Sequence, residues 1–361
     1  MSMDSNRWND IIAPIIRQAI SDGVFSGCVV GLAQADGSSC SFPFGYDDSL
    51  AQPGAIQANS IFDIASVTKS VATGSLALLR ILQGKLDPDC PVQKILPEYR
   101  TNVGNEVRIW HLLTHSLDYR FPMSSLKDLP AEEILRRVFE HSFRQAPGSL
   151  FCYGNASSLV LGILLERLSG EPLDQQASRD LFAPLKMQRT GWFPLKRHSA
   201  EEIVPTEICP WRNKVIRGEV HDESAYALRS HGAVGSAGLF SCVPDLLRFC
   251  TMMLNDGRFG DTRVIPQGVL NLATTNRLQH LPGESTALGW ELANHRFMGS
   301  FTSPRCFGKT GFTGASLVCE PDQGLALVLL SNFTWPQREK SVERIYAVRR
   351  TLADAVFGNP Q

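Results

Sequence analysis

Paired cysteine motifs are missing from this sequence. Its nine cysteines form an odd set, and no two of them follow a Cys-x-x-Cys spacing. Such a set argues against both a disulfide framework and a zinc cluster. We therefore interpret most of them as small buried hydrophobic residues, at positions 28, 40, 90, 152, 209, 242, 250, 306 and 319.

An excess of charge of either sign is also missing. Lysine and arginine total 35 against 36 aspartate and glutamate residues, so no basic field exists to hold nucleic acid or an anionic membrane. The expected partner is a small, roughly neutral molecule. The sequence leaves the oligomeric state open.

Long hydrophobic runs are absent. The longest ones, such as residues 325–330, are far shorter than a membrane span. The first eight residues lack the basic and apolar regions of a secretory signal. We therefore expect a cytoplasmic protein, although a trimmed export signal would leave the same sequence.

Internal repeats and low-complexity segments are missing as well, while 361 residues exceed one typical core. Residues 28–35 and 39–46 predict two strands joined across Asp36-Gly37, and residues 315–319 and 325–331 repeat this pattern near the other end of the chain. Helical periodicity marks residues 7–21, 66–83, 131–141, 157–168, 244–254 and 337–357.

The predicted fold class is therefore α+β, with an antiparallel sheet built from both chain termini in an α/β sandwich and a mostly helical subdomain between them. We expect residues 1–65 and 286–361 to form the sheet domain. Residues 66–285 are expected to form the inserted helical domain.

A serine and a lysine three residues apart, Ser66 and Lys69, stand where the helix of residues 66–83 is predicted to begin. Positions i and i+3 share a helix face, so the amine can activate the hydroxyl as a nucleophile. Ser124 and Lys127 repeat the spacing in a polar segment without helical periodicity. We interpret that copy as a chance match without a catalytic role. Alone, Ser66 could equally be a helix N-cap with a solvent-facing lysine.

Two further motifs follow in the sequence, Tyr153-Gly154-Asn155 and Lys309-Thr310-Gly311, each found once. Taken singly, each has a structural explanation, since Asn155 could cap a helix, Tyr153 could be a core aromatic residue and residues 309–311 could end a strand. The three motifs together in this order favour a catalytic site.

In this order the motifs resemble the penicillin-recognising serine hydrolases, in particular the class C β-lactamase-like branch with its esterases and D-amino-acid peptidases. The resemblance extends through residues 61–69, 84–87, 95–98, 111–115, 147–148, 235–241 and 308–314. It covers about residues 28–332 and implies the β-lactamase/transpeptidase-like fold.

The resemblance implies roles for individual residues. Ser66 would attack an ester or amide carbonyl, Lys69 and Tyr153 would accept and return its proton, and Asn155 would hold Lys69 and the substrate. Lys309, followed by Thr310 and Gly311, would supply a cation beside Tyr153 that could also meet a substrate carboxylate. The backbone N–H groups of Ser66 and Phe312 would form the oxyanion hole.

Other catalytic readings find little support. His111 and His115 have a metal-like spacing but no glutamate at the second position and no evident third ligand, so we expect packed histidines and no metal or cofactor. A Gly-x-Ser-x-Gly elbow and a phosphate-cradling glycine loop are both absent.

The substrate stays open at this stage. We expect a serine hydrolase that cleaves a small ester or amide through an acyl-serine intermediate. The alternatives are a genuine class C-type β-lactamase or D,D-peptidase or D-aminopeptidase, and a catalytically inactive binding or assembly module. One segment departs from the family pattern, because residues 116–118 are Ser-Leu-Asp where Thr-Ser-Gly is common. A second segment, with His221, Asp222 and Glu223, has no assigned chemistry, and we interpret these residues as loop anchors.

Overall fold

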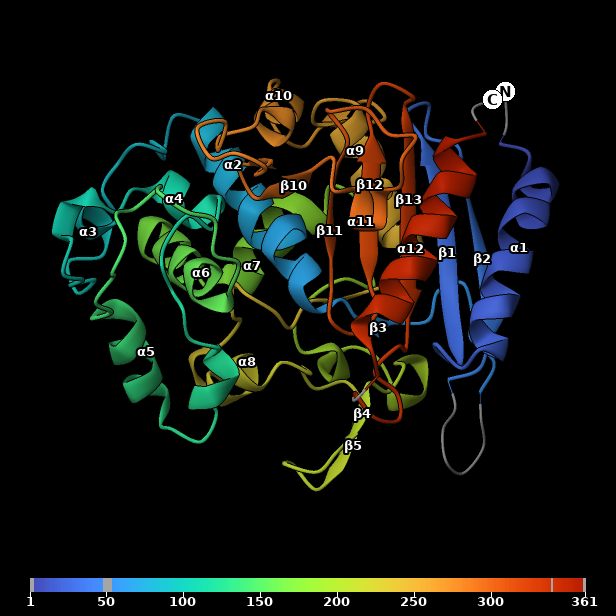
Figure 1. Cartoon of the computed structure of the whole chain (residues 1–361), viewed down its shortest axis with the longest axis horizontal. Helices are drawn as coiled ribbons and strands as arrows, with labels where there is room; N and C mark the ends of the chain where they lie inside the picture. Colours follow the sequence, from blue (N-terminus) through green and yellow to red (C-terminus); the bar gives the residue numbers. More distant parts are fainter. Residues whose placement is uncertain (1–2, 48–53, 339, 360–361) are drawn as a thin grey trace.

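The computed structural model describes residues 3–47, 54–338 and 340–359. Among these residues the largest sheet has seven strands, all paired antiparallel, and Figure 1 shows it beside a mostly helical region. The strand order is β2 (Ser39–Gly45), β1 (Gly27–Gln34), β13 (Leu325–Ser331), β12 (Ser316–Glu320), β11 (Phe307–Thr310), β10 (Trp290–Leu292) and β9 (Thr286–Ala287). The neighbouring strands β1 and β13 pair the two ends of the chain, which confirms the predicted sheet and fold class.

Helices cover both faces of the sheet. On one face α1 (Ser5–Ser21) packs against α12 (Val342–Phe357), which also contacts α11 (His295–Met298) (Figure 1). On the other face α9 (Val243–Leu254) packs on β1 and β13. Side chains of β13 alternate between the two cores, as a pleated strand buried on both faces requires.

The helical region lies on the side of the sheet where β10 is labelled in Figure 1. Its α-helices are α2 (Ser75–Leu82), α3 (Val92–Ile95), α4 (Ile109–Leu113), α5 (Ala131–Phe139), α6 (Asn155–Ser169), α7 (Leu173–Ala177), α8 (Glu223–Ala227) and α10 (Val269–Thr274). Its shorter helical turns are η3 (Gly104–Glu106), η4 (Met123–Leu126), η5 (Ser178–Phe182), η6 (Pro194–Lys196), η7 (Ala200–Glu202) and η8 (Arg229–His231). The small two-stranded pairs are β3 (Phe62–Asp63) with β6 (Phe240–Ser241), β4 (Glu207–Cys209) with β5 (Lys214–Ile216), and β7 (Arg258–Phe259) with β8 (Thr262–Arg263).

The two regions share a hydrophobic core. One continuous cluster runs from Val29 on β1 through Leu76 on α2 to Leu161 on α6. Helix α9 falls in the sequence range expected for the insertion and yet packs on the sheet. The division at residues 65 and 286 therefore stays a prediction.

The helix expected over residues 66–83 is irregular at its start. A 3-10 turn, η1 (Ala65–Val67), leads into a π-helical segment, η2 (Lys69–Gly74), and only then into α2. The hydroxyl of Ser70 donates to the carbonyl of Gly289 at 2.6 Å, and the hydroxyl of Ser75 donates to the Ser70 carbonyl at 2.9 Å. The Ser75 bond adds a donor to a carbonyl of the π-helical segment, and the Ser70 bond ties this segment to the connection between β9 and β10.

No helix within the described residues is both long enough and apolar enough to cross a membrane.

Candidate active site

The structure places Ser66 in η1, directly after β3, with its side chain partly exposed. The preceding residue, Ala65, has a φ of 46°, a left-handed conformation that is costly for a residue with a Cβ atom. The buried carboxylate of Asp63 holds this turn, accepting the Ala65 N–H at 2.8 Å and the His221 N–H at 2.7 Å. Burial raises the pKa of Asp63 to about 6 in spite of these two donors.

The ammonium nitrogen of Lys69 reaches three acceptors. Lys69 Nζ lies 2.9 Å from Ser66 Oγ, 2.8 Å from Asn155 Oδ1 and 2.7 Å from the carbonyl oxygen of Ser236. Burial lowers the pKa of Lys69, and this effect outweighs the raising effects of Tyr153 and Asp222. The predicted Ser-Lys pair is therefore in hydrogen-bonding contact.

Tyr153 stands above both lysines. The residue is 44% exposed. Lys309 Nζ lies 4.0 Å and Lys69 Nζ 5.5 Å from the centre of its ring, and its hydroxyl forms a hydrogen bond with Ser66. Burial of the hydroxyl raises the pKa of Tyr153, but the cations of Lys309 and Lys69 and the bond to Ser66 more than offset it. The pKa therefore lies below its ordinary value.

Lys309, on β11, is buried and paired with Glu291 on β10, with Lys309 Nζ 2.6 Å from Glu291 Oε1. Burial lowers the pKa of Lys309, but the charge and hydrogen bond of Glu291 together with the effect of Tyr153 more than offset it. The pKa of Lys309 therefore lies above its ordinary value, and the side chain stays an ammonium. Because the neighbouring carboxylate already meets this cation, the geometry disfavours a direct pairing with a substrate carboxylate. Sequence reasoning missed Glu291, which belongs to no motif.

Asn155 is the first residue of α6 and is held from two sides. While its Oδ1 accepts from Lys69, its Nδ2 donates to Asp222 Oδ2 at 2.8 Å and to Ser224 Oγ at 3.2 Å. Asp222 also caps α8 by accepting the Ala225 N–H at 2.8 Å. Asp222 is thus an anchor, as expected of its loop, and it also orients Asn155.

The turn after β11 carries Phe312, whose backbone N–H, like that of Ser66, has no protein acceptor among the described residues. A Cβ atom on Gly311 would lie 2.4 Å from the carbonyl oxygen of Ile64, so only glycine allows this approach to the nucleophile turn. The turn is fixed further by Thr313 Oγ1, which donates to the Asp63 carbonyl at 2.7 Å, and by Arg349, which donates to the Gly311 carbonyl at 2.9 Å. Asp63 and Arg349 lie outside the three predicted motifs.

A cavity of about 660 Å³ opens over Ser66 and Tyr153. Its walls come from residues 119–124, 152–155 and 221–223, together with Phe312 and Arg338. A smaller hollow of about 280 Å³ lies beside Ser66 and Thr310, where Thr310 Oγ1 is 3.3 Å from the hydroxyl of Tyr346. Ser66 therefore lies between two open spaces and lines both of them.

The remaining candidates lie elsewhere or serve packing. Ser124 lines the far wall of the large cavity, but Lys127 Nζ lies over the Trp211 ring, 4.9 Å from its centre, so this second pair does not assemble as the first does. His111 Nδ1 accepts the Arg108 N–H at 2.9 Å, and the buried His115 ring packs 4.9 Å from Tyr153.

Comparison with known proteins identifies the family. The beta-lactamase family matches residues 13–350. A protein of Escherichia coli K12 named "Putative D-alanyl-D-alanine carboxypeptidase" is 30% identical over 324 residues, covering 80% of this chain and 73% of that protein.

Solved structures share the fold. EstCE1, described as a hydrolase with promiscuous acyltransferase activity, superposes with a TM-score of 0.77 at 22% identity over 97% of this chain and 98% of that one. A penicillin-binding protein homologue from Caulobacter crescentus superposes with a TM-score of 0.75 at 16% identity over 99% and 98%. These matches confirm the predicted fold and resemblance, and the chain belongs to the beta-lactamase family of hydrolases.

Proposed function

We propose that this chain cleaves a small ester or amide through an acyl-Ser66 intermediate. The observation that carries the proposal is the hydrogen-bonding of Lys69, whose nitrogen contacts Ser66 Oγ, Asn155 Oδ1 and the Ser236 carbonyl at once. A neutral amine would keep its two hydrogens on Asn155 and Ser236, which can only accept here, and would present its lone pair to the Ser66 hydroxyl. The burial that lowers the pKa of Lys69 favours this neutral form.

The proposed reaction has two stages, acylation and deacylation of Ser66. Ser66 Oγ bonds to the carbonyl carbon while its proton passes to Lys69 or Tyr153, and the developing oxyanion meets the N–H groups of Ser66 and Phe312. The bond to the leaving group then breaks, and the leaving group takes the proton from the same pair. Water next attacks the acyl-Ser66 carbonyl and gives a proton to Lys69 or Tyr153. The bond between Ser66 Oγ and the acyl carbon then breaks, Ser66 Oγ takes that proton, and the acid departs.

The second candidate is a β-lactamase or a D,D-peptidase. It is favoured by the relative from Escherichia coli K12, whose name refers to D-alanyl-D-alanine. The pairing of Lys309 with Glu291 weighs against this second candidate. The ion pair leaves the Lys309 ammonium less available to the carboxylate that such substrates carry. An inactive binding module is less favoured still, since the geometry keeps Ser66, Lys69 and Tyr153 in contact.

A cytoplasmic location remains a proposal. All nine cysteines are free, and most are buried. This is the state that a reducing compartment maintains.

Intact-protein mass spectrometry with a fluorophosphonate and with benzylpenicillin tests the proposal, alongside turnover of p-nitrophenyl esters and a chromogenic cephalosporin. Ser124→Ala is the matched control for Ser66→Ala, because Ser124 belongs to the second Ser-x-x-Lys pattern and lines the same cavity. We expect a fluorophosphonate adduct and ester turnover in the wild type and in Ser124→Ala, and neither in Ser66→Ala.

The substrate classes separate in the same experiment. Ester turnover without penicillin acylation supports the esterase proposal, whereas a long-lived penicillin adduct supports the peptidase alternative and rapid cephalosporin turnover the β-lactamase. Absence of both adducts and of Ser66-dependent turnover would overturn the enzymatic proposal.

A further inference from the structure

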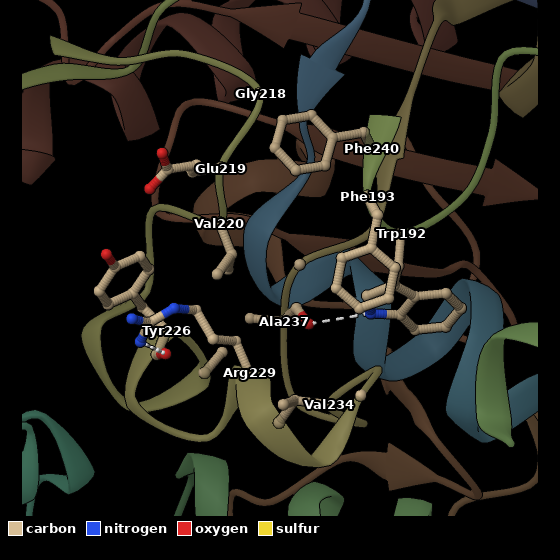
Figure 2. A pocket seen from close by; sticks show the side chains of 13 residues that line it. Trp192, Phe193, Gly218, Glu219, Val220, Tyr226, Arg229, Val234, Ala237 and Phe240 are labelled. Atoms are coloured by element: carbon tan, nitrogen blue, oxygen red, sulfur yellow. Dashed lines mark hydrogen bonds between the residues drawn. The ribbon is translucent and has the colours of Figure 1, made fainter. Parts of the chain in front are cut away.

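A further cavity of about 210 Å³, shown in Figure 2, shares Ala237 with the large cavity over Ser66. Four aromatic side chains line it, together with two valines from the facing segments: Trp192, Phe193, Tyr226, Phe240, Val220 and Val234. Neither the family motifs nor the proposed reaction uses this space.

The cavity has an apolar end and a charged end. In Figure 2, Trp192 and Phe193 lie on one side and Glu219, Tyr226 and Arg229 on the other. At the apolar end the polar groups are already paired, since Trp192 Nε1 donates to the Ala237 carbonyl at 3.3 Å. Water entering that end finds few partners there, so an apolar occupant gains the free energy of leaving water without displacing well-held solvent.

The wall between the cavity and the active site is one short segment, residues 235–239. Ala237 lines both cavities, and the carbonyl of the preceding Ser236 accepts from Lys69 at 2.7 Å. The same segment is tied to the nucleophile-bearing helical segment by Thr73 Oγ1, which donates to the Gly235 carbonyl at 2.8 Å, and by Thr68 Oγ1, which accepts the Leu239 N–H at 3.1 Å. The segment that forms this wall of the cavity therefore also carries the carbonyl group that holds Lys69.

The volume limits the occupant. A dry protein cavity of about 150 Å³ lined by aliphatic and aromatic side chains takes up benzene, so a space of about 210 Å³ holds one aromatic ring or a short branched aliphatic chain. We propose that this cavity is a binding site for such a group on a free small molecule, because residues 235–239 separate it from the space over Ser66. The binding does not depend on the proposed function, whereas the effect on turnover does.

Ligand-observed NMR with toluene tests the binding. Val234→Phe and Val220→Phe fill the cavity from two walls, and Val215→Phe makes the same change on the exposed strand β5 as a matched control. We expect saturable binding in the wild type and in Val215→Phe, and a loss of affinity of about tenfold or more in each filled variant, because the apolar area that toluene buries is then occupied.

Toluene-soaked crystals of the unchanged protein locate the ligand even if a filled variant does not fold, and density against Trp192 is expected. Absence of saturable binding, density elsewhere, or equal affinity in folded filled variants would overturn the proposal.

Turnover of p-nitrophenyl acetate tests whether the bound molecule affects Ser66. If it does, toluene changes acetate turnover in the wild type and not in Val234→Phe. Toluene binding without this effect supports the site and rules out its coupling to Ser66, while absence of all turnover would count against the proposed function alone.

Discussion

The ammonium of Lys309 lies 4.0 Å from the centre of the Tyr153 ring. It is buried and paired with the Glu291 carboxylate, which fixes its position, and it also contacts the face of the Tyr153 ring. A cation at this place stabilises the phenolate of Tyr153 and disfavours the ammonium of Lys69, and both effects favour removal of the Ser66 proton near neutral pH.

Loss of this cation should shift the pH dependence upward. We expect Lys309→Met combined with Glu291→Gln to raise the pKa of both Tyr153 and Lys69, because each is lowered by Lys309. The double substitution avoids leaving the Glu291 carboxylate buried without its partner. The rising limb of kcat/KM should move to higher pH, with a loss of about tenfold or more at pH 7. An unchanged pH profile would contradict this role of Lys309, and Glu291→Gln alone is the control.

Asp222 should matter for catalysis beyond its role as a helix cap. Asp222→Ala removes the cap of α8 and the support of Asn155, whereas Asp4→Ala removes only the cap of α1. Each substitution should destabilise the fold by about 1 kcal/mol. Only Asp222→Ala should lower kcat, and it should move the acid limb to lower pH, since Asp222 raises the pKa of Lys69. Equal activity of the two variants, measured beside thermal unfolding, would argue against the catalytic contribution.

Gly311→Ala should damage the oxyanion hole. The added Cβ atom would meet the Ile64 carbonyl oxygen at 2.4 Å and push the turn that carries the Phe312 N–H. Loss of one such donor costs other enzymes about a hundredfold or more in kcat, and we expect a loss of that order. Gly37→Ala, in a hairpin turn with a φ of 92° and open space around it, should cost about 1 kcal/mol of stability and leave kcat unchanged. A Gly311→Ala variant with normal kcat would show that the turn tolerates the side chain.

The buried carboxyl of Asp63 should make stability depend on pH. Its folded pKa of about 6 lies above the ordinary value of about 4, so the folded state binds this proton more tightly than the unfolded state. The stabilisation is complete below about pH 4 and is lost as pH rises through about 6. The stability of the wild type relative to Asp63→Asn should therefore fall by up to about 3 kcal/mol between pH 4 and pH 7. Denaturant unfolding of both proteins at the two pH values measures this difference, and a constant difference would contradict it.

Most of the fold follows from local patterns. Alternation and turn residues predicted β1 with β2 and β12 with β13, and helical periodicity predicted α1, α6 and α9 to within a few residues. Local sequence did not reveal the π-helical start of residues 69–74, where Ser70 donates to Gly289 on a segment distant in the sequence. It also did not indicate that α9 packs on the sheet.

The sequence by itself determined which groups are proposed to react, since each of the three motifs is a short stretch whose residue types carry the chemistry. It also indicated which Ser-x-x-Lys pair would assemble, through the helical pattern that follows Ser66. Only the tertiary structure decided which groups would tune them. Asp63, Glu291, Asp222 and Arg349 act on motif residues across long sequence separations, so no spacing in the chain reveals them. Their effects come from burial and from charges a few ångströms apart, and these quantities exist only once the chain has folded.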